Sequence, residues 1–285
     1  MTSHRIIQGD CIEGLRTLPD ASVHCCVTSP PYWGLRDYGH DGQIGLESTP
    51  EAYVARMVEV FREVRRVLRD DGTLWLNLGD TYGSGKQLKG IPWRVAFALQ
   101  SDGWVLRQDI IWAKPNPMPE SVRDRCTKAH EYVFLFAKGE RYFYDSAAVR
   151  EAAIPQKRMG ESAIGYATPK HSAGARHTGT GGRRSTLNAS TGSHKNRRSV
   201  WLVATRQYSG AHFAVMPPDL ARWCIKAGCT EGGTVLDPFA GSGTTLAVAA
   251  ELGRSGIGCE LNPEYIELAE QRIAKSKAKM PLFVA

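Results

Sequence analysis

An apolar segment at residues 23–29 runs into the turn Ser29-Pro30-Pro31-Tyr32-Trp33. Two consecutive prolines supply carbonyl acceptors on a stiff backbone and contribute no N–H donors. Tyr32 and Trp33 add flat aromatic surface beside these acceptors. Acceptors next to an aromatic ring suit an exocyclic amine on a planar base, although the same local pattern also occurs as ordinary packing.

A second turn of chemical interest lies in the segment 235–245, which reads VLDPFAGSGTT. A glycine turn between a strand and a helix lets the backbone approach a ligand and present its N–H groups. An acid, Glu260, ends the next predicted strand 19 residues after Gly241, a spacing suited to ribose hydroxyls. A dinucleotide site would need a small residue where Leu246 stands, and Asp237 suits a positive amino group better than a pyrophosphate. The pattern therefore favours S-adenosylmethionine, with a turn that binds no ligand as the alternative.

The elements that must position these turns follow from apolar periodicity. Strands are predicted at 5–8, 23–29, 73–79, 106–112, 234–237 and 255–260, and a hairpin at 131–138 and 141–145. Helices are predicted at 11–18, 50–68, 91–100, 217–227, 244–252 and 262–277. Strands that alternate with helices predict an α/β fold with a mostly parallel sheet.

The positive charge is concentrated in one segment. The 285-residue chain has a formal net charge of +7, and residues 155–198 hold nine Lys or Arg against one acid, Glu161. The rest of the chain is therefore nearly neutral, which predicts a polyanion partner at one place, with a solvated basic loop as the alternative. The residues suited to contact phosphates are Arg183, Arg184, Lys195, Arg197 and Arg198.

Several classes of protein are excluded by composition. No apolar run approaches 18 residues, which argues against a transmembrane helix, and the first residues lack the apolar stretch of a secretory signal. The seven cysteines show no CxxC spacing. This usage predicts a cytoplasmic protein with neither a disulfide framework nor a metal site.

Taken together, the sequences SPPY at 29–32 and DPFAGSGTT at 237–245 resemble motifs of the amino DNA methyltransferases, which act on cytosine N4 or adenine N6. The motif order, with the catalytic motif first and the cofactor turn last, is similar to the β-type permuted arrangement of that family. The resemblance implies a three-layer α/β/α Rossmann-like methyltransferase fold. It also implies a catalytic half at 1–153, a basic target-recognition insertion at 154–199 and a cofactor-binding half at 200–285.

The resemblance assigns roles to individual residues. The implied catalytic residues are Ser29, Pro30, Pro31 and Tyr32. The implied S-adenosylmethionine contacts are Asp10, Cys11, Ser29, Pro30, Phe213, Asp237, Pro238, Phe239, Gly241, Ser242, Gly243, Thr244, Glu260 and Leu261.

The resemblance also implies a reaction on a base that has been flipped out of duplex DNA. In this family, Ser at position 29 favours cytosine N4 and Asp favours adenine N6. Methylation at cytosine C5 is rejected because the Pro-Cys nucleophile of that class does not occur in the chain. Adenine N6 or RNA methylation and an inactive nucleic-acid-binding protein remain alternatives. The implied partners are double-stranded DNA, a second copy of the chain in a homodimer and a cognate restriction endonuclease.

Overall fold

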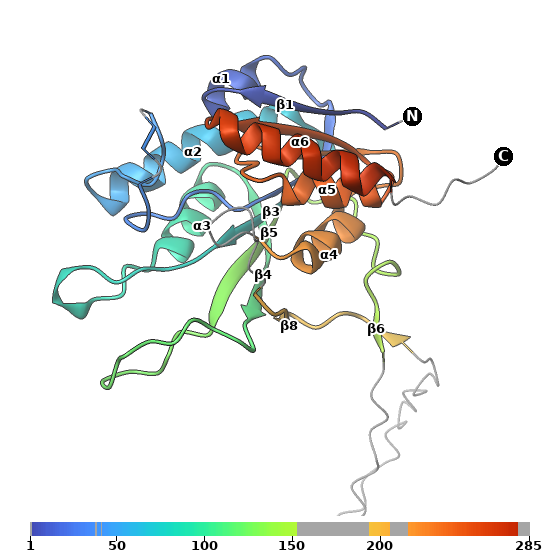
Figure 1. Cartoon of the computed structure of the whole chain (residues 1–285). Helices are drawn as coiled ribbons and strands as arrows, with labels where there is room; N and C mark the ends of the chain where they lie inside the picture. Colours follow the sequence, from blue (N-terminus) through green and yellow to red (C-terminus); the bar gives the residue numbers. More distant parts are fainter. Residues whose placement is uncertain (1, 38, 41, 153–193, 206–215, 279–285) are drawn as a thin grey trace, which may run out of the picture. The chain divides into compact units, whose positions relative to one another are not determined.

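The computed structural model describes residues 2–37, 39–40, 42–152, 194–205 and 216–278 (Figure 1). Contacts divide the chain into two units, one made of Met1–Val149 with Arg198–Ala285 and the other of Arg150–Arg197. The two predicted halves therefore build a single unit. In the described part of the second unit, β6 (Glu151–Ala152) pairs antiparallel with β7 (His194–Lys195).

The first unit is built on an eight-stranded sheet. Its strands, in spatial order, are β1 (His4–Gln8), β10 (Ser255–Glu260), β9 (Thr234–Asp237), β2 (Val23–Thr28), β3 (Leu68–Leu78), β5 (His130–Ala137), β4 (Val105–Ala113) and β8 (Val200–Leu202). Every neighbouring pair is parallel except the two pairs made by β5, which runs antiparallel to β3 and β4. The predicted mostly parallel sheet is confirmed.

Helices cover both faces of this sheet. One apolar cluster packs α1 (Cys11–Arg16), α2 (Pro50–Val67) and α3 (Ile91–Ser101) on one face, where Leu74 and Leu76 of β3 point. The other face carries α4 (Pro218–Gly228), toward which Trp75 points, together with α5 (Thr244–Glu251) and α6 (Pro263–Ala278). Burial on both faces explains why the strands read as nearly continuous apolar runs. The three-layer α/β/α architecture is therefore confirmed.

The start of α2 shows how local sequence sets an element boundary. Thr49 lies in extended backbone and its side chain accepts a hydrogen bond from the N–H of Ala52 at 3.1 Å. Pro50 takes the first helical position, where its missing N–H removes no helical bond. Both features were predicted from the sequence, and the helix begins there.

The predicted hairpin of 131–138 with 141–145 is wrong. The strand β5 lies between β3 and β4, and residues 141–145 form no strand. The alternating aromatics of this segment instead pack individually: Tyr144 stacks on Trp75 with centroids 6.3 Å apart, and the Tyr142 ring lies 5.5 Å from the Arg107 guanidinium. Because β5 is apolar on both faces, a central place in the sheet buries more of it than an edge hairpin would.

Candidate active site

The two motif turns meet at the tips of neighbouring strands. The strand β2 carries Ser29 at its end, and it pairs in parallel with β9, which ends at Asp237. The hydroxyl of Thr28 donates a hydrogen bond to Asp237 Oδ1 at 2.6 Å, which ties the two strand ends together. Because carboxyl ends of parallel strands gather at one edge, residues more than 200 positions apart face the same space, as the sequence predicted.

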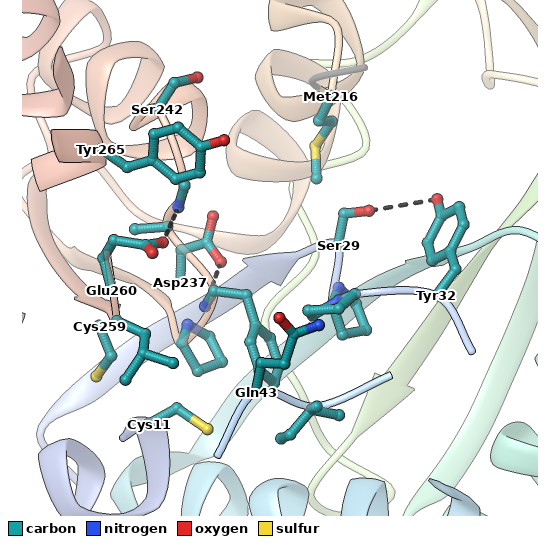
Figure 2. A pocket seen from close by; sticks show the side chains of 18 of the residues that line it. Cys11, Ser29, Tyr32, Gln43, Met216, Asp237, Ser242, Cys259, Glu260 and Tyr265 are labelled. Carbon is teal, nitrogen blue, oxygen red and sulfur yellow. Dashed lines mark hydrogen bonds between the residues drawn. The ribbon is translucent and has the colours of Figure 1, made fainter. Parts of the chain in front are cut away.

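A cavity of about 320 Å³ lies at this edge, which is within the range of small-molecule sites. In Figure 2 the side chains of Asp237 and Glu260 lie on one side of it and those of Ser29 and Tyr32 on the other. The predicted site residues that line it are Asp10, Cys11, Ser29, Pro30, Pro31, Tyr32, Asp237, Pro238, Phe239, Gly241, Ser242, Thr244, Glu260 and Leu261. Phe213 lies outside the described residues.

Gly243, predicted as a cofactor contact, does not line the cavity. It caps the start of α5 with a φ of 75°, and a Cβ built on it would lie 2.6 Å from Cβ of Ala269 in α6. The glycine therefore allows α5 and α6 to approach closely. Its position next to the ligand turn explains why sequence reasoning gave it a ligand role.

Alanine at position 243 is expected to lower the free energy of unfolding by roughly 1–3 kcal/mol, since it forces both a strained φ and an overpacked contact. Chemical denaturation would measure this loss. Gly253→Ala is the matched control, because Gly253 has a similar φ of 70° but open space around its Cβ position. Equal losses in the two variants would show that helix packing is not the reason for the glycine.

The cofactor-facing carboxyl of Asp237 is buried and well connected. It accepts hydrogen bonds from Thr28 and from the N–H of Phe239 at 3.1 Å. Burial raises the pKa of Asp237 to about 6, and the nearby Glu260 carboxylate adds to this, while the hydrogen bonds oppose it. A buried carboxyl held in this way is stabilised in its ionised form by a positively charged ligand.

Glu260 organises the glycine turn from the end of β10. Its Oε2 accepts the N–H of Gly241 and its Oε1 accepts that of Asn262, both at 2.8 Å. Burial raises the pKa of Glu260, and these backbone donors oppose the shift. Since each carboxylate oxygen has further lone pairs, Glu260 can still accept hydrogen bonds from ligand hydroxyls.

Two cysteines line the cavity without providing a nucleophile. Burial raises the pKa of the Cys11 and Cys259 thiols to about 12, with the carboxylates of Asp10 and Asp237 adding to the shift. Both therefore stay protonated near neutral pH, whereas cysteine attacks as the thiolate. This agrees with the rejection of cytosine C5 chemistry.

The hydroxyl of Ser29 belongs to a polar network with three other side chains. Tyr32 donates its proton to Glu131 Oε2 at 2.6 Å, and the amide of Asn77 donates to Tyr32 at 2.7 Å and to Ser29 at 3.2 Å. Because the Tyr32 proton is committed to Glu131, the contact of 3.3 Å between Ser29 and Tyr32 has Ser29 as its donor. Ser29 thus keeps a lone pair that can accept a proton from a ligand amine.

The two proline carbonyls of the turn have different surroundings. The Pro31 carbonyl accepts a hydrogen bond from the buried Tyr53 hydroxyl at 2.9 Å. The Pro30 carbonyl receives none from the described part of the chain, although Pro30 is buried and lines the cavity. A buried acceptor without a donor is costly unless a ligand supplies one. The turn therefore offers the Pro30 carbonyl and the Ser29 hydroxyl as a pair of acceptors.

Sequence reasoning missed part of this lining. Asn77 was seen only as part of a core strand, and His130-Glu131 and the segment 114–117 were weighed as base contacts or ordinary structure. The structure places Lys114, Glu131 and Asn77 in the lining, together with Ile44, Met216 and Tyr265. The signal for Asn77 was present, because it is the one polar residue in the buried run LWLNL at 74–78.

The predicted DNA contacts fall in different parts of the chain. Arg183 and Arg184 lie outside the described residues. In the second unit, Lys195 pairs with Glu151 at 3.5 Å. In the first unit, the Arg198 carbonyl accepts a hydrogen bond from the Trp201 indole at 2.8 Å. The role of these residues in binding DNA stays a prediction.

Two searches of the described residues concern other classes of site. In this part of the chain, no group of three or more His, Cys, Asp or Glu side chains is arranged to hold a metal ion. No helix among the described elements has the length and apolar character needed to cross a membrane.

Comparisons with known proteins agree with the site. A family model described as DNA methylase, which covers enzymes of the N6 and N4 type, matches residues 23–271. The type II methyltransferase M.SmaI of Serratia marcescens is 45% identical over 97% of this chain and 93% of its own length. The type II methyltransferase M.XycI of Xanthomonas campestris pv. cyanopsidis is 46% identical over 94% of this chain and 87% of its own.

Solved structures share the fold. The cytosine-N4-specific PvuII DNA methyltransferase superposes with a TM-score of 0.70 at 20% identity, covering 98% of this chain and 93% of that one. The DNA modification methylase TTHA0409 of Thermus thermophilus, solved with S-adenosyl-L-methionine, gives a TM-score of 0.64 at 28% identity and covers 97% of both chains. The three-layer sheet with its two converging turns is thus the methyltransferase fold, and the chain belongs to the DNA methylase family of N6 and N4 amino-methyltransferases.

Proposed function

We propose that this DNA methylase transfers a methyl group from S-adenosyl-L-methionine to the exocyclic N4 amine of a cytosine flipped out of duplex DNA. The observation that carries the proposal is the shared cavity that holds a buried carboxylate, Asp237, and a pair of acceptors at Ser29 and Pro30. One part suits a cationic methyl donor and the other suits an amine. The two parts lie on adjacent strands, so donor and acceptor would meet at the sheet edge.

The residues present fit S-adenosyl-L-methionine. Its amino group would pair with Asp237, and its ribose hydroxyls would donate to Glu260. Apolar and aromatic side chains, among them Ile44, Phe239 and Tyr265, would cover the adenine ring. The TTHA0409 methylase, which is 28% identical, was solved with this molecule bound, which supports the assignment. When bound, the cofactor supplies the methyl group from its sulfonium centre.

The acceptor pair would prepare the amine. The lone pair of a cytosine amine is delocalised into the ring, which makes the amine a poor nucleophile. Hydrogen bonds from the amine to the Pro30 carbonyl and the Ser29 hydroxyl favour a more tetrahedral nitrogen whose lone pair points along the transfer direction. Catalysis of this kind rests on orientation and electrostatics, and Tyr32 would supply the aromatic surface beside the base.

The choice of cytosine N4 rests on Ser29, since serine at this place of the motif favours N4 in the family. Adenine N6 is the second candidate, because adenine also presents an amine next to a ring nitrogen that accepts hydrogen bonds. The cytosine-N4-specific PvuII neighbour is only 20% identical, so it supports the fold and leaves the base to be tested.

The DNA partner follows from the family and from the charge. We place the DNA contacts in the basic segment 154–199, whose Lys and Arg side chains would neutralise phosphates. Since relatives such as M.SmaI are type II methyltransferases, a cognate restriction endonuclease is the partner system to look for. The β-type motif order and a homodimer belong to the same proposal.

The base is decided by analysing the product. The protein is incubated with labelled S-adenosyl-L-methionine and unmethylated duplex DNA, and the DNA is digested to nucleosides that are identified by mass. N4-methylcytosine is the expected product. N6-methyladenine would replace the proposal with its second candidate, and the absence of label on DNA would overturn it.

Replacing Ser29 with alanine is expected to lower kcat roughly 10- to 100-fold, because one acceptor of the amine is lost. The affinity for cofactor should change less than about threefold, since Asp237 and Glu260 are untouched. Steady-state kinetics and calorimetric titration with S-adenosylhomocysteine measure the two quantities. Full activity in Ser29→Ala would show that the hydroxyl takes no part in transfer.

A further inference from the structure

A half-buried lysine lies at the rim of the cavity next to the Ser29 network. Lys114 follows the last residue of β4, and its side chain is 18% exposed. Its ammonium donates to Glu131 Oε1, and Glu131 Oε2 accepts the proton of Tyr32. Lys114 is therefore connected to Ser29 through two side chains, Glu131 and Tyr32.

The lysine is held but not saturated. Glu131 takes one of its three N–H bonds, and the ring of Trp112 lies 4.5 Å from the ammonium on another side. Among the described residues, nothing else accepts a hydrogen bond from this ammonium. Lysine has three donors and no acceptor. An N–H is thus left for a ligand that enters the cavity Lys114 lines.

We infer that Lys114 donates a hydrogen bond to the ring nitrogen next to the target amine, which is N3 in cytosine. This inference rests on the proposed function, which places the amine at Ser29 and Pro30. An amine donor beside a ring acceptor is the edge that separates cytosine from thymine, whose N3 carries a proton. The acceptors at Ser29 and Pro30 and the donor at Lys114 match this edge.

Glu131 makes such a donor tolerable beside the reacting group. A lone ammonium would repel the positive charge that develops on the amine nitrogen during transfer. The carboxylate, whose side chain is 14% exposed, lies between Lys114 and Tyr32 and balances that charge. Glu131 is therefore a positioning residue: it fixes the ammonium on one side and orients the Tyr32 hydroxyl on the other.

The test combines a protein change with a base change. Lys114→Met removes the donor and keeps much of the stem. A target 3-deazacytosine replaces N3 with a C–H group and keeps the amine. Wild type and variant are each assayed for kcat/KM on duplexes that carry either base. The altered pairing and amine reactivity of the analogue affect both enzymes equally and cancel in the comparison.

On cytosine, Lys114→Met is expected to lower kcat/KM roughly 10- to 100-fold, the size of one lost charged hydrogen bond. The wild type should lose a similar factor on 3-deazacytosine. The variant should lose less than about threefold more on the analogue, because its donor is already gone. Independent, multiplying losses would overturn the inference, as would a variant that is as active as the wild type on cytosine.

Controls separate this outcome from unfolding and from an error in the proposed base. Lys138→Met is the matched control, because its side chain is 19% exposed and its ammonium also donates to a single strong acceptor, the Leu68 carbonyl at 2.9 Å, at the other end of β5. It should show no base-dependent effect. If Lys114→Met fails to fold by its Tm, Lys114→Gln enters the same cycle. If the product is N6-methyladenine, the proposed function fails, and the cycle with 1-deazaadenine still decides the role of Lys114.

Discussion

Alanine in place of Gly79 is expected to lower the rate of methyl transfer at least about 100-fold while cofactor binding is kept. Gly79 directly follows β3, and a Cβ built on it would lie 2.5 Å from Cε2 and 2.9 Å from Cδ2 of Tyr32. The ring would have to move, and its hydroxyl would leave Glu131 and Asn77. A displacement of this size in a positioned group typically costs about two orders of magnitude in rate.

The measurement for Gly79→Ala is kcat at saturating DNA and cofactor, together with the Kd for S-adenosylhomocysteine. The Kd should stay within about threefold, because Asp237 and Glu260 lie on the other side of the cavity from Tyr32 (Figure 2). Gly139→Ala is the control, since Gly139 has no atom within 4 Å of its Cβ position and no left-handed φ. An active Gly79→Ala enzyme would mean that transfer does not depend on where the Tyr32 ring lies.

The convergence of the two motifs was predictable because it depends on chain direction alone. Ser29 and Asp237 each follow a buried strand, and parallel strands bring their carboxyl ends to one edge. The helix start at Thr49 was equally local. Apolar period, a cap and the direction of the chain therefore decide most of the fold and the two halves of the site.

The rest depended on distant contacts that no local pattern carries. Asn77 and Glu131 meet because β5 runs antiparallel to β3, with Asn77 opposite Val133. The wrong hairpin came from the same source, because aromatic alternation at 141–145 is typical of a strand but here serves separate side-chain contacts. Gly243 shows a third limit, since a glycine required by a neighbouring helix has the same sequence signal as one required by a ligand.

The buried carboxyl of Asp237 leads to an opposed pair of effects on stability and binding. Its pKa is raised to about 6 from the ordinary value of 3.8, mainly by burial. Well below that ordinary value the carboxyl is protonated in both the folded and the unfolded chain, so it costs nothing. As the pH rises from about 4 through 6, the unfolded chain ionises more readily, and folding stability is lost. A shift of this size corresponds to roughly 2–3 kcal/mol above pH 7.

Asp237→Asn keeps the acceptor for Thr28 and Phe239 and removes the charge. The ligand-free variant is therefore expected to be more stable than the wild type at pH 8, by roughly 2–3 kcal/mol, and about equally stable near pH 3. Binding should change in the opposite sense. The Kd for S-adenosylhomocysteine should rise at least about 30-fold at pH 8, because the ligand's amino group loses its buried partner.

The pH dependence of binding distinguishes this charge effect from a change of shape. In the wild type, ligand affinity should rise as Asp237 ionises between about pH 5 and 7, by at most about tenfold per unit, and level off above its pKa. In Asp237→Asn that rise should be lost, apart from a part due to Glu260, whose pKa is also raised by burial. Glu140→Gln, a change at an exposed carboxyl, should leave both curves as they are. A variant that is less stable at pH 8, or that binds as tightly as the wild type, would show that the Asp237 charge is neither a cost to the free fold nor a partner for the ligand.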